Sequence, residues 1–413
     1  MKILFIHQSF PGQFKHLLLK LQAHNIDLSV ICSDSVKRKI PGISYFSYRI
    51  SQGNGSDTHP LALETESKVI RGEAVAAVAK NLRDSGYIPN LIIAHPGWGE
   101  ALFLKHIWPT TPQLHYVEYM YGSAGTDSDF LDVHSPPSDW KEASRTVMKN
   151  ANTLLNLNTM SWGVTPTHFQ LNTLPEWARR STSVIHDGIN TSWAIPNKQA
   201  TLRLKNGILL SKKSEVITFV NRTFEPYRGI HVFIDALKLV LKAKSNAQVL
   251  LVGTNTPNVS YGKKRSDGKG WLDVLYEETH HDLDWSRIHV LGQVSHETLL
   301  NIYQISSAHV YLTYPFVLSW SLLEAMSCEC LIIASDTPPV LEVIKNNING
   351  LTVPFTSPKS LSSKIIYALD NQDELNRLRV AARKTILENY DLESCLRRQL
   401  SLVLSLLKNT TVA

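Results

Sequence analysis

Short apolar runs alternate with helical patterns along the whole chain. Strand-like runs occur at residues 2–7, 27–32, 91–94, 113–117 and 153–156, with helical patterns at 13–24 and 64–85. After an irregular stretch at 190–214, the alternation restarts with strands at 216–220, 248–252, 288–291, 309–312 and 331–334, and helices at 231–244 and 321–327. Strands that alternate with helices predict parallel sheets with helices on both faces.

The restart of this pattern predicts two doubly wound, Rossmann-like α/β domains. The chain has 413 residues, which is enough for two separate cores. We place the first domain at residues 1–195 and the second at residues 196–390. Apolar residues at helical spacing predict a last helix within residues 391–413 that packs back on the first domain. Because such sheets bind ligands beyond the carboxyl ends of their strands, we expect the active site in the cleft between the domains.

The composition is that of an ordinary globular protein, with 43% hydrophobic and 19% charged residues. The net charge of +6 is spread along the chain, which argues against a nucleic-acid partner and suits anionic small molecules or a membrane surface. The four cysteines form no disulfide framework, and the C-E-C string at 328–330 lacks zinc-site spacing. The N-terminal apolar run is too short for a signal peptide, and no run could span a bilayer. We therefore expect a cytoplasmic protein, for which peripheral contact with the inner face of the membrane stays open.

The loop N-R-T-F-E-P-Y-R-G at 221–229 is the first candidate for chemistry. Arg222 follows a predicted strand and Arg228 precedes a predicted helix. Guanidinium groups bind phosphate oxygens in pairs of hydrogen bonds, and a helix N-terminus adds amide donors, so this loop predicts a diphosphate site. The alternative is two solvated arginines on a surface turn. As loop residues, neither arginine is expected to contribute to the core.

Two further loops have features of a ligand site. In the string at 314–326, a loop leads into a helix start, where free amides favour anionic oxygen and Glu324 could hold a ribose. The alternative is that Glu324 only interacts with the helix dipole. In the loop at 7–14, Gly12 would let the backbone approach a phosphate closely. The chain has neither G-x-G-x-x-G nor a P-loop motif, which argues against NAD and P-loop chemistry.

Several strings together resemble glycosyltransferase family 4 over nearly the whole chain. They are FPGQF at 10–14, AHPGWGEALFLK at 94–105, NRTFEPYRG at 221–229, YLTYPFVLSWSLLEAM at 311–326, SDTPPVLEVI at 335–344 and NGLTVPF at 349–355. The resemblance implies a GT-B fold and retaining transfer of a sugar from a nucleotide-diphosphate donor, with a uridine donor expected over a guanosine donor. It does not identify the acceptor, which could be a glycan, a lipid-linked molecule or a small molecule.

The resemblance also assigns residues of the second domain. Arg222 and Arg228 take the places of the basic pair on the donor diphosphate, with Arg228 where Lys is more usual. Glu324 matches the second glutamate of the E-x7-E motif, which holds the ribose. The first glutamate of that motif is replaced by Phe316, so the resemblance does not identify the sugar of the donor. Val294 falls where main-chain groups contact the nucleobase.

Ser319 and Trp320 lie where the family's backbone meets the sugar or phosphate, and Gly12 matches the loop glycine near the diphosphate. The family often has a histidine that aligns here with either His115 or Glu118. We prefer Glu118, which lies nearer the strand end, and the alternative is a structural carboxylate paired with an arginine.

His95, also at a strand end, is a candidate for the acceptor side. A lone histidine in a loop is more often structural.

The implied mechanism is front-side displacement without a covalent intermediate, in which the arginines stabilise the departing diphosphate. Closure of the domains would exclude water from the donor. We expect no cofactor and no metal, because the arginines and helix dipoles take the place of a cation.

Other functions share some of these sequence features. A metal-dependent glycosyltransferase would use an Asp-x-Asp motif, which occurs at 127–129 and 282–284, but it has a single-domain fold. A nucleotide-sugar epimerase and a phosphorylase share the architecture, although no string marks the pyridoxal lysine of a phosphorylase. A catalytically inactive sugar-nucleotide-binding subunit is the non-enzymatic alternative, and Phe316 is the feature that favours it.

Overall fold

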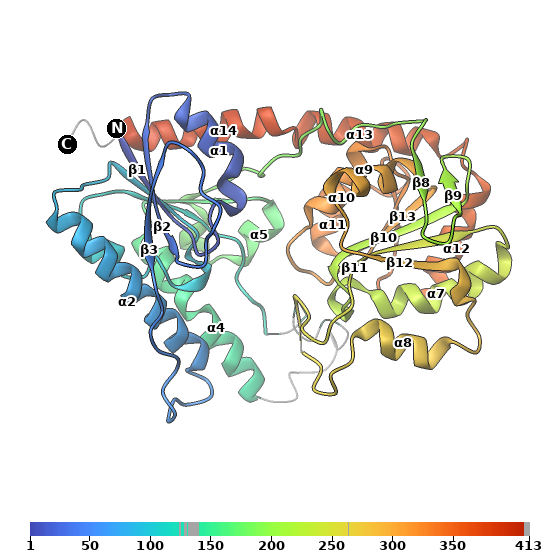
Figure 1. Cartoon of the computed structure of the whole chain (residues 1–413), viewed down its shortest axis with the longest axis horizontal. Coiled ribbons are helices and arrows are strands. Elements are labelled where there is room, and N and C mark those ends of the chain that lie inside the picture. The colour runs from blue at the N-terminus through green and yellow to red at the C-terminus, as the bar shows by residue number, and fades with distance from the viewer. Residues whose placement is uncertain (124, 128–129, 131–139, 263, 409–413) are drawn as a thin grey trace. The chain divides into compact units, whose positions relative to one another are not determined.

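The computed structural model describes residues 1–123, 125–127, 130, 140–262 and 264–408 (Figure 1). The chain divides into two compact units. Unit 1 contains Met1–Gly188 together with the chain from Glu393 on, and unit 2 contains Ile189–Leu392. Each unit has one parallel sheet with helices on its faces, which confirms the predicted fold class of two Rossmann-like domains.

Unit 1 is built on a seven-stranded parallel sheet. Its strand order is β3 (Ile43–Tyr48), β2 (Asp27–Ser33), β1 (Lys2–Ile6), β4 (Leu91–Ala94), β5 (Gln113–Tyr116), β6 (Trp162–Thr165) and β7 (Thr182–Val184). The strand order reverses between β1 and β4, which makes this the point where doubly wound sheets bind ligands. The central strands read as unbroken apolar runs because helices cover both of their faces.

The helical segments of unit 1 follow the strands in the usual alternation. They are η1 (Gly12–Phe14), α1 (Lys15–Gln22), α2 (Leu63–Asp84), η2 (Pro96–Trp98), α3 (Leu104–Ile107), α4 (Trp140–Thr159), α5 (His168–Thr173), α6 (Glu176–Arg179) and α14 (Leu392–Lys408). Helix α14 is held to unit 1 by polar contacts as well as by its buried face. Arg398 donates to the Val184 carbonyl at 2.8 Å, and Lys20 pairs with Glu393 at 2.6 Å.

The predicted strand at 153–156 is wrong, because these residues lie inside helix α4 and the strand β6 comes after them. The helix buries Asn152 and Asn156, whereas Leu155 is 57% exposed. Asn152 donates to the Pro96 carbonyl at 2.8 Å, so polar side chains occupy the buried face. Because amides occupy the buried face and leucines are exposed, the helix lacks the pattern of a core-facing helix, and its leucine pair resembled a short strand.

Unit 2 contains a six-stranded parallel sheet and a small antiparallel hairpin. The sheet order is β12 (Ile288–Gly292), β11 (Gln248–Thr254), β10 (Val216–Thr223), β13 (Ala308–Tyr311), β14 (Ile332–Ser335) and β15 (Leu351–Val353). The hairpin of β8 (Thr201–Arg203) and β9 (Leu209–Ser211) lies in the stretch that the sequence pattern left irregular.

The helices of unit 2 cover both faces of this sheet. They are η4 (Pro226–Arg228), α7 (Ile230–Ala243), α8 (Trp271–Thr279), η5 (Trp285–Arg287), α9 (His296–Ile305), α10 (Trp320–Ser327), α11 (Pro338–Val343), α12 (Pro358–Asp370) and α13 (Asn376–Asn389). Phe219 of β10 stacks on Phe233 of α7 at 4.7 Å, which ties the helix to the strand that precedes it. None of the helices in the described part of the chain has the length and hydrophobicity that a membrane span requires.

Candidate active site

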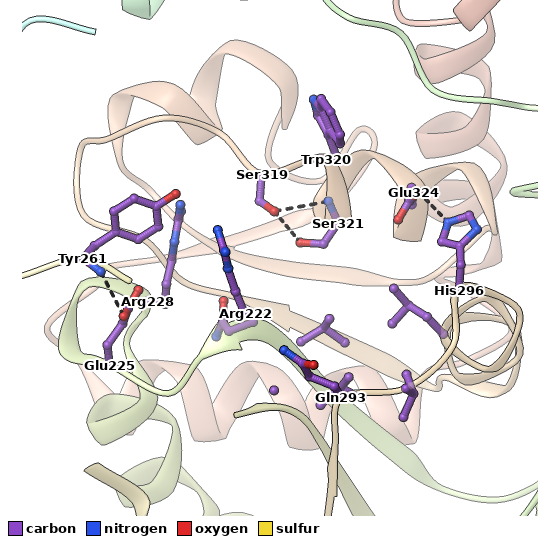
Figure 2. A pocket seen from close by; sticks show the side chains of 16 residues that line it. Arg222, Glu225, Arg228, Tyr261, Gln293, His296, Ser319, Trp320, Ser321 and Glu324 are labelled. Carbon is purple, nitrogen blue, oxygen red and sulfur yellow. Dashed lines mark hydrogen bonds and ion pairs between the residues drawn. The ribbon is translucent and has the colours of Figure 1, made fainter. Parts of the chain in front are cut away.

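A pocket of about 720 Å³ opens in unit 2 at the carboxyl edge of its sheet (Figure 2). Its walls come from the ends of β10 and β11, the segments after β10 and β12, and the first turns of α9 and α10. The lining residues are Val220, Asn221, Arg222, Glu225, Arg228, Val252, Gly253, Tyr261, Gln293, Val294, His296, Leu299, Ser319, Trp320, Ser321 and Glu324. The pocket therefore brings together six of the residues that the sequence proposed for donor binding.

Arg228 is buried, with only 5% of its surface exposed, and this corrects the expectation that it would not contribute to the core. Its Nη1 donates to the Thr313 hydroxyl at 2.7 Å and the Tyr311 hydroxyl at 3.2 Å. Both terminal nitrogens also donate to the Val317 carbonyl at 3.3 Å. These partners are neutral, and no described residue forms an ion pair with the guanidinium group. The Glu225 carboxylate interacts with Arg228 electrostatically but forms no ion pair with it, so the buried guanidinium still favours an anionic ligand.

Arg222 differs from Arg228 in being exposed at the end of β10. Among the described residues it has no hydrogen-bond or ion-pair partner. Figure 2 shows the two arginine side chains next to each other, both pointing into the pocket. Two neighbouring cations without a carboxylate between them suit a ligand with more than one negative charge, such as a diphosphate.

The turn that carries Arg228 depends on Gly229. This residue has φ +70°, and a Cβ atom there would lie 2.6 Å from the Leu312 Cβ, so only glycine fits. The tight turn brings η4 directly to the start of α7.

Glu225 fixes the neighbouring wall of the pocket and was not identified from the sequence. Its Oε2 accepts hydrogen bonds from the Thr223 hydroxyl at 2.7 Å, the Ser260 amide at 2.7 Å and the Tyr261 amide at 3.1 Å. Burial raises the pKa of Glu225. Since two of its partners, Ser260 and Tyr261, lie in the segment after β11, only the folded chain shows this role, and the carboxylate holds the segment that carries Tyr261.

The start of α10 supplies the opposite wall. Ser319 caps the helix by accepting from the Ser321 amide at 3.2 Å, and its own amide donates to the Tyr311 hydroxyl at 3.0 Å. Trp320 begins the helix with 47% of its surface exposed. This first turn lines the pocket, and the positive end of the helix dipole there favours anionic oxygen.

Glu324 lies one turn further along α10 and contacts a residue that the sequence did not indicate. The His296 Nε2 is 2.8 Å from the Glu324 Oε1, and the Glu324 side chain is 20% exposed. His296 begins α9, directly after the segment of Val294. This contact directs the carboxylate at the pocket, where it could accept hydrogen bonds from a ligand diol.

Phe316, which replaces the family's first glutamate, is buried in an aromatic cluster. Its ring lies 4.9 Å from the ring of Tyr261 and 5.8 Å from that of Tyr227. Only 4% of Phe316 is exposed, and it does not line the pocket. Tyr261 lines the pocket instead, with the Arg228 guanidinium 5.2 Å from its ring centre. The wall beside Arg228 is therefore aromatic at the point where a carboxylate was expected.

Unit 1 holds the other candidates, which cluster at the ends of β4 and β5. The His95 Nε2 lies 3.7 Å from the Glu118 Oε2, and the Glu118 side chain is 51% exposed. His95 is stacked on Trp98 at 4.3 Å and accepts from the Gly97 amide through Nδ1 at 3.2 Å. His7 lies beside His95, and burial together with the charge of His95 lowers its pKa to about 4. The cluster thus presents an accessible carboxylate held by a buried imidazole.

His115 is completely buried in β5 and bonded to Gln113 at 3.0 Å, and burial lowers its pKa to about 3. A side chain without exposed surface cannot contact an acceptor, so of the two aligned residues only Glu118 is accessible. Gly12 has φ +49°, and a Cβ atom there would lie 2.5 Å from the His7 Nε2. This loop therefore needs glycine for its own packing beside His7.

The aspartates of the two Asp-x-Asp strings have local partners. Asp127 accepts from the Tyr119 hydroxyl at 3.1 Å and the Gly122 amide at 3.2 Å, and Asp129 lies outside the described residues. Asp282 pairs with Lys238 at 3.3 Å, and Asp284 caps η5. Within the described ranges, no group of three or more His, Cys, Asp or Glu side chains has the arrangement of a metal site.

Both halves of the chain match glycosyltransferase family models. Residues 24–194 match the glycosyl transferase family 4 group, and residues 202–385 match the glycosyl transferases group 1. No curated protein sequence gives a match.

Solved structures share the two-domain fold at low sequence identity. Sucrose-phosphate synthase from Thermosynechococcus elongatus is 18% identical, with 99% of this chain and 100% of that chain covered and a TM-score of 0.73. A glycosyltransferase from Rickettsia africae is 18% identical, with 99% of both chains covered and a TM-score of 0.66. Anabaena HepE in complex with UDP and glucose is 16% identical, with 98% and 99% covered and a TM-score of 0.69. The structural likeness shows the architecture, and the two family models support a glycosyltransferase.

Proposed function

We propose that this chain, a GT-B glycosyltransferase similar to family 4, transfers a sugar from a UDP-sugar to an acceptor hydroxyl and retains the anomeric configuration. The observation that carries the proposal is the pair Arg222 and Arg228, two cations in one pocket without a carboxylate in contact. The structures of Anabaena HepE with UDP and with UDP-glucose support a uridine donor.

In this proposal, the diphosphate binds between Arg222 and Arg228. As the bond from the sugar to the diphosphate breaks, negative charge grows on the leaving oxygen, and fixed guanidinium groups stabilise it most strongly at that stage. Arg228 is already oriented by Thr313, Tyr311 and Val317, so it needs no rearrangement when the charge develops. The two arginines take the place that a divalent metal has in other transferases.

The remaining pocket residues would hold the rest of the donor. Glu324, oriented by His296, would accept hydrogen bonds from the ribose diol, and the main chain at Val294 would contact the base. Ser319 and Trp320, at the positive end of α10, would lie beside the sugar or the phosphate.

The acceptor would react by front-side displacement. Its hydroxyl oxygen bonds to the anomeric carbon on the side from which the diphosphate departs, and its proton passes to the departing phosphate oxygen. Glu118 in unit 1, held by His95, would accept a hydrogen bond from the acceptor hydroxyl. Because the hydroxyl bonds to the face from which the diphosphate leaves, the anomeric configuration is retained without a covalent intermediate.

The proposal is tested by incubating the protein with a panel of UDP-sugars in the presence of EDTA and measuring release of free UDP. Release that depends on Arg222 and Arg228, without added metal, supports it. UDP binding without any turnover of the panel would favour an inactive sugar-nucleotide-binding subunit, the function suggested by Phe316. NMR of the product's anomeric proton decides between retention and inversion.

A further inference from the structure

Unit 1 has a second pocket, of about 540 Å³, between the loop after β1 and the loop after β2. We call it the basic pocket, because its charged lining residues are Lys15, Lys37 and Arg38. The hydroxyls of Ser9 and Ser35 also line it, and the lining contains no carboxylate. It differs from the UDP pocket of the proposed function, which lies wholly in unit 2.

The three cations of the basic pocket have no ion-pair partner among the residues the structure describes. Lys37 reaches only a main-chain oxygen, the Asp34 carbonyl at 3.5 Å. The Asp34 carboxylate itself faces Arg49 at 3.8 Å. Three cations around one cavity repel one another, and an anion bound among them lowers that repulsion.

The loops around the pocket are held in place by hydrogen bonds to the sheet. The Asp34 amide donates to the Tyr48 carbonyl at 3.1 Å, and the Ser33 amide donates to the Gln8 carbonyl at 3.3 Å, which joins the two loops. The Ile40 amide donates to the Tyr45 hydroxyl at 2.9 Å. The basic side chains thus project from a backbone that is already ordered, which lowers the entropy cost of binding.

The position of the pocket agrees with its interpretation as a ligand site. It lies beyond the carboxyl ends of β1 and β2, next to the reversal of strand order between β1 and β4. Doubly wound sheets bind their ligands at this edge. Phe10 forms part of the wall, with 3% of its surface exposed and its ring 5.8 Å from Tyr45, so one side of the cavity is rigid and apolar.

We propose that the basic pocket binds a phosphate group of the acceptor substrate, an inference that rests on the proposed function. A phosphate monoester carries up to two charges and several acceptor oxygens. Arg38 can bind two of these oxygens, while Lys15 and Lys37 act as point charges and the Ser9 and Ser35 hydroxyls donate hydrogen bonds. A neutral acceptor would leave all three cations without a partner. The phosphate could belong to a soluble sugar phosphate or to a lipid.

Binding is measured with the unit 2 pocket saturated by UDP. The phosphate probes then cannot bind to Arg222 and Arg228, and any binding reflects another site. Glucose 6-phosphate and inorganic phosphate are titrated by calorimetry, with glucose as the uncharged comparison. The variant is Lys37→Gln with Arg38→Gln. The matched control is Lys80→Gln with Arg83→Gln, which removes one lysine and one arginine from the exposed face of α2.

Glucose 6-phosphate should bind the wild type and the control, and should bind the Lys37/Arg38 variant about tenfold or more weakly. Glucose should not bind measurably. If glucose 6-phosphate binds, equal affinity of the variant and the control, or equal binding of glucose and glucose 6-phosphate, would overturn the proposal. Because the altered side chains are exposed, the melting temperature should not change, and Lys15→Gln gives a second variant if the loop is disturbed.

A lipid source is tested by co-sedimentation with phosphatidylcholine vesicles, with and without phosphatidic acid. Binding that needs phosphatidic acid and is lost in the Lys37/Arg38 variant assigns the phosphate to a lipid, and binding of glucose 6-phosphate alone assigns it to a soluble acceptor. If neither probe binds, the phosphate site is refuted. The proposed function can fail independently of this site. In that case UDP does not bind in unit 2, whereas the basic pocket still binds phosphate.

Discussion

Replacing Arg222 by alanine separates ligand binding from fold maintenance more cleanly than any other substitution in the pocket. Arg222 is exposed at the end of β10 and has no partner among the described residues. Its removal should therefore change the free energy of unfolding by no more than about 0.5 kcal/mol, as is usual for surface substitutions. Arg228→Ala does not allow this separation, because it leaves the buried Val317 carbonyl without its donors, at a cost of about 1–3 kcal/mol.

The loss of function expected from Arg222→Ala follows from its charged hydrogen bonds to the diphosphate. Such bonds contribute about 1.5–3 kcal/mol, so the Kd for UDP should rise about 10- to 150-fold. Turnover should fall further, by about 10²–10³, because the charge on the leaving diphosphate is greatest in the transition state.

Calorimetry with UDP, release of UDP from a donor and a thermal melt of the ligand-free protein measure the three quantities. Arg203→Ala is the matched control, since Arg203 is an exposed arginine of the same unit on β8, outside the pocket. A Kd for UDP in Arg222→Ala that equals the Arg203→Ala value would refute the diphosphate assignment. A lowered melting temperature would show instead that Arg222 supports the fold.

Three further variants test other parts of the account. Gly229→Ala should lower the free energy of unfolding by about 1–3 kcal/mol in urea melts. Gly207 also has a positive φ but has open space around it, so Gly207→Ala should lower the free energy of unfolding by less. Equal losses would mean that close packing at Gly229 is unimportant. Glu324→Gln should weaken UDP binding about tenfold and 2′-deoxy-UDP binding much less. His296→Gln should weaken UDP binding by less than Glu324→Gln does. Equal losses for both nucleotides in Glu324→Gln would show that Glu324 does not hold the ribose. Burial lowers the pKa of His309 to about 3 from its ordinary 6.5, so the folded protein keeps this ring neutral while the unfolded chain takes up a proton below pH 6.5. The free energy of unfolding therefore falls as the pH falls from about 6.5 towards 3. His309→Gln should reduce the slope of the free energy of unfolding against pH in this range by up to about 1.4 kcal/mol per pH unit. An unchanged slope between denaturant melts at pH 7 and pH 5 would contradict this.

The central strands could be predicted from the sequence because they are buried on both faces. Runs such as 216–220, 248–252 and 331–334 are almost entirely apolar, and each corresponds to a strand of the unit 2 sheet. The short strands β3 and β7 and the hairpin in the region 190–214 lack this signal. Helix α4 was missed because its packing relies on buried asparagines, whose partners lie on other segments.

The candidate site shows the same division between local and long-range information. Arg222, Arg228, Ser319, Trp320 and Glu324 were identified from two local strings, and they line one pocket. The sequence could not show that one arginine is buried and the other exposed, since both follow the same strand.

The supporting residues could not be read from the sequence either, because their partners are distant in the chain. His296 is 28 positions from Glu324, and Glu225 is 35 positions from Ser260. Contacts of this kind arise only when the strands of the sheet bring their loops to one edge.

The most direct test of the central claim is calorimetric titration of UDP into the protein, once with EDTA and once with Mg²⁺. The account predicts one site with the same Kd in both buffers, because Arg222 and Arg228 supply the charge that binds the diphosphate. Absence of binding, or binding that appears only with Mg²⁺, would contradict it.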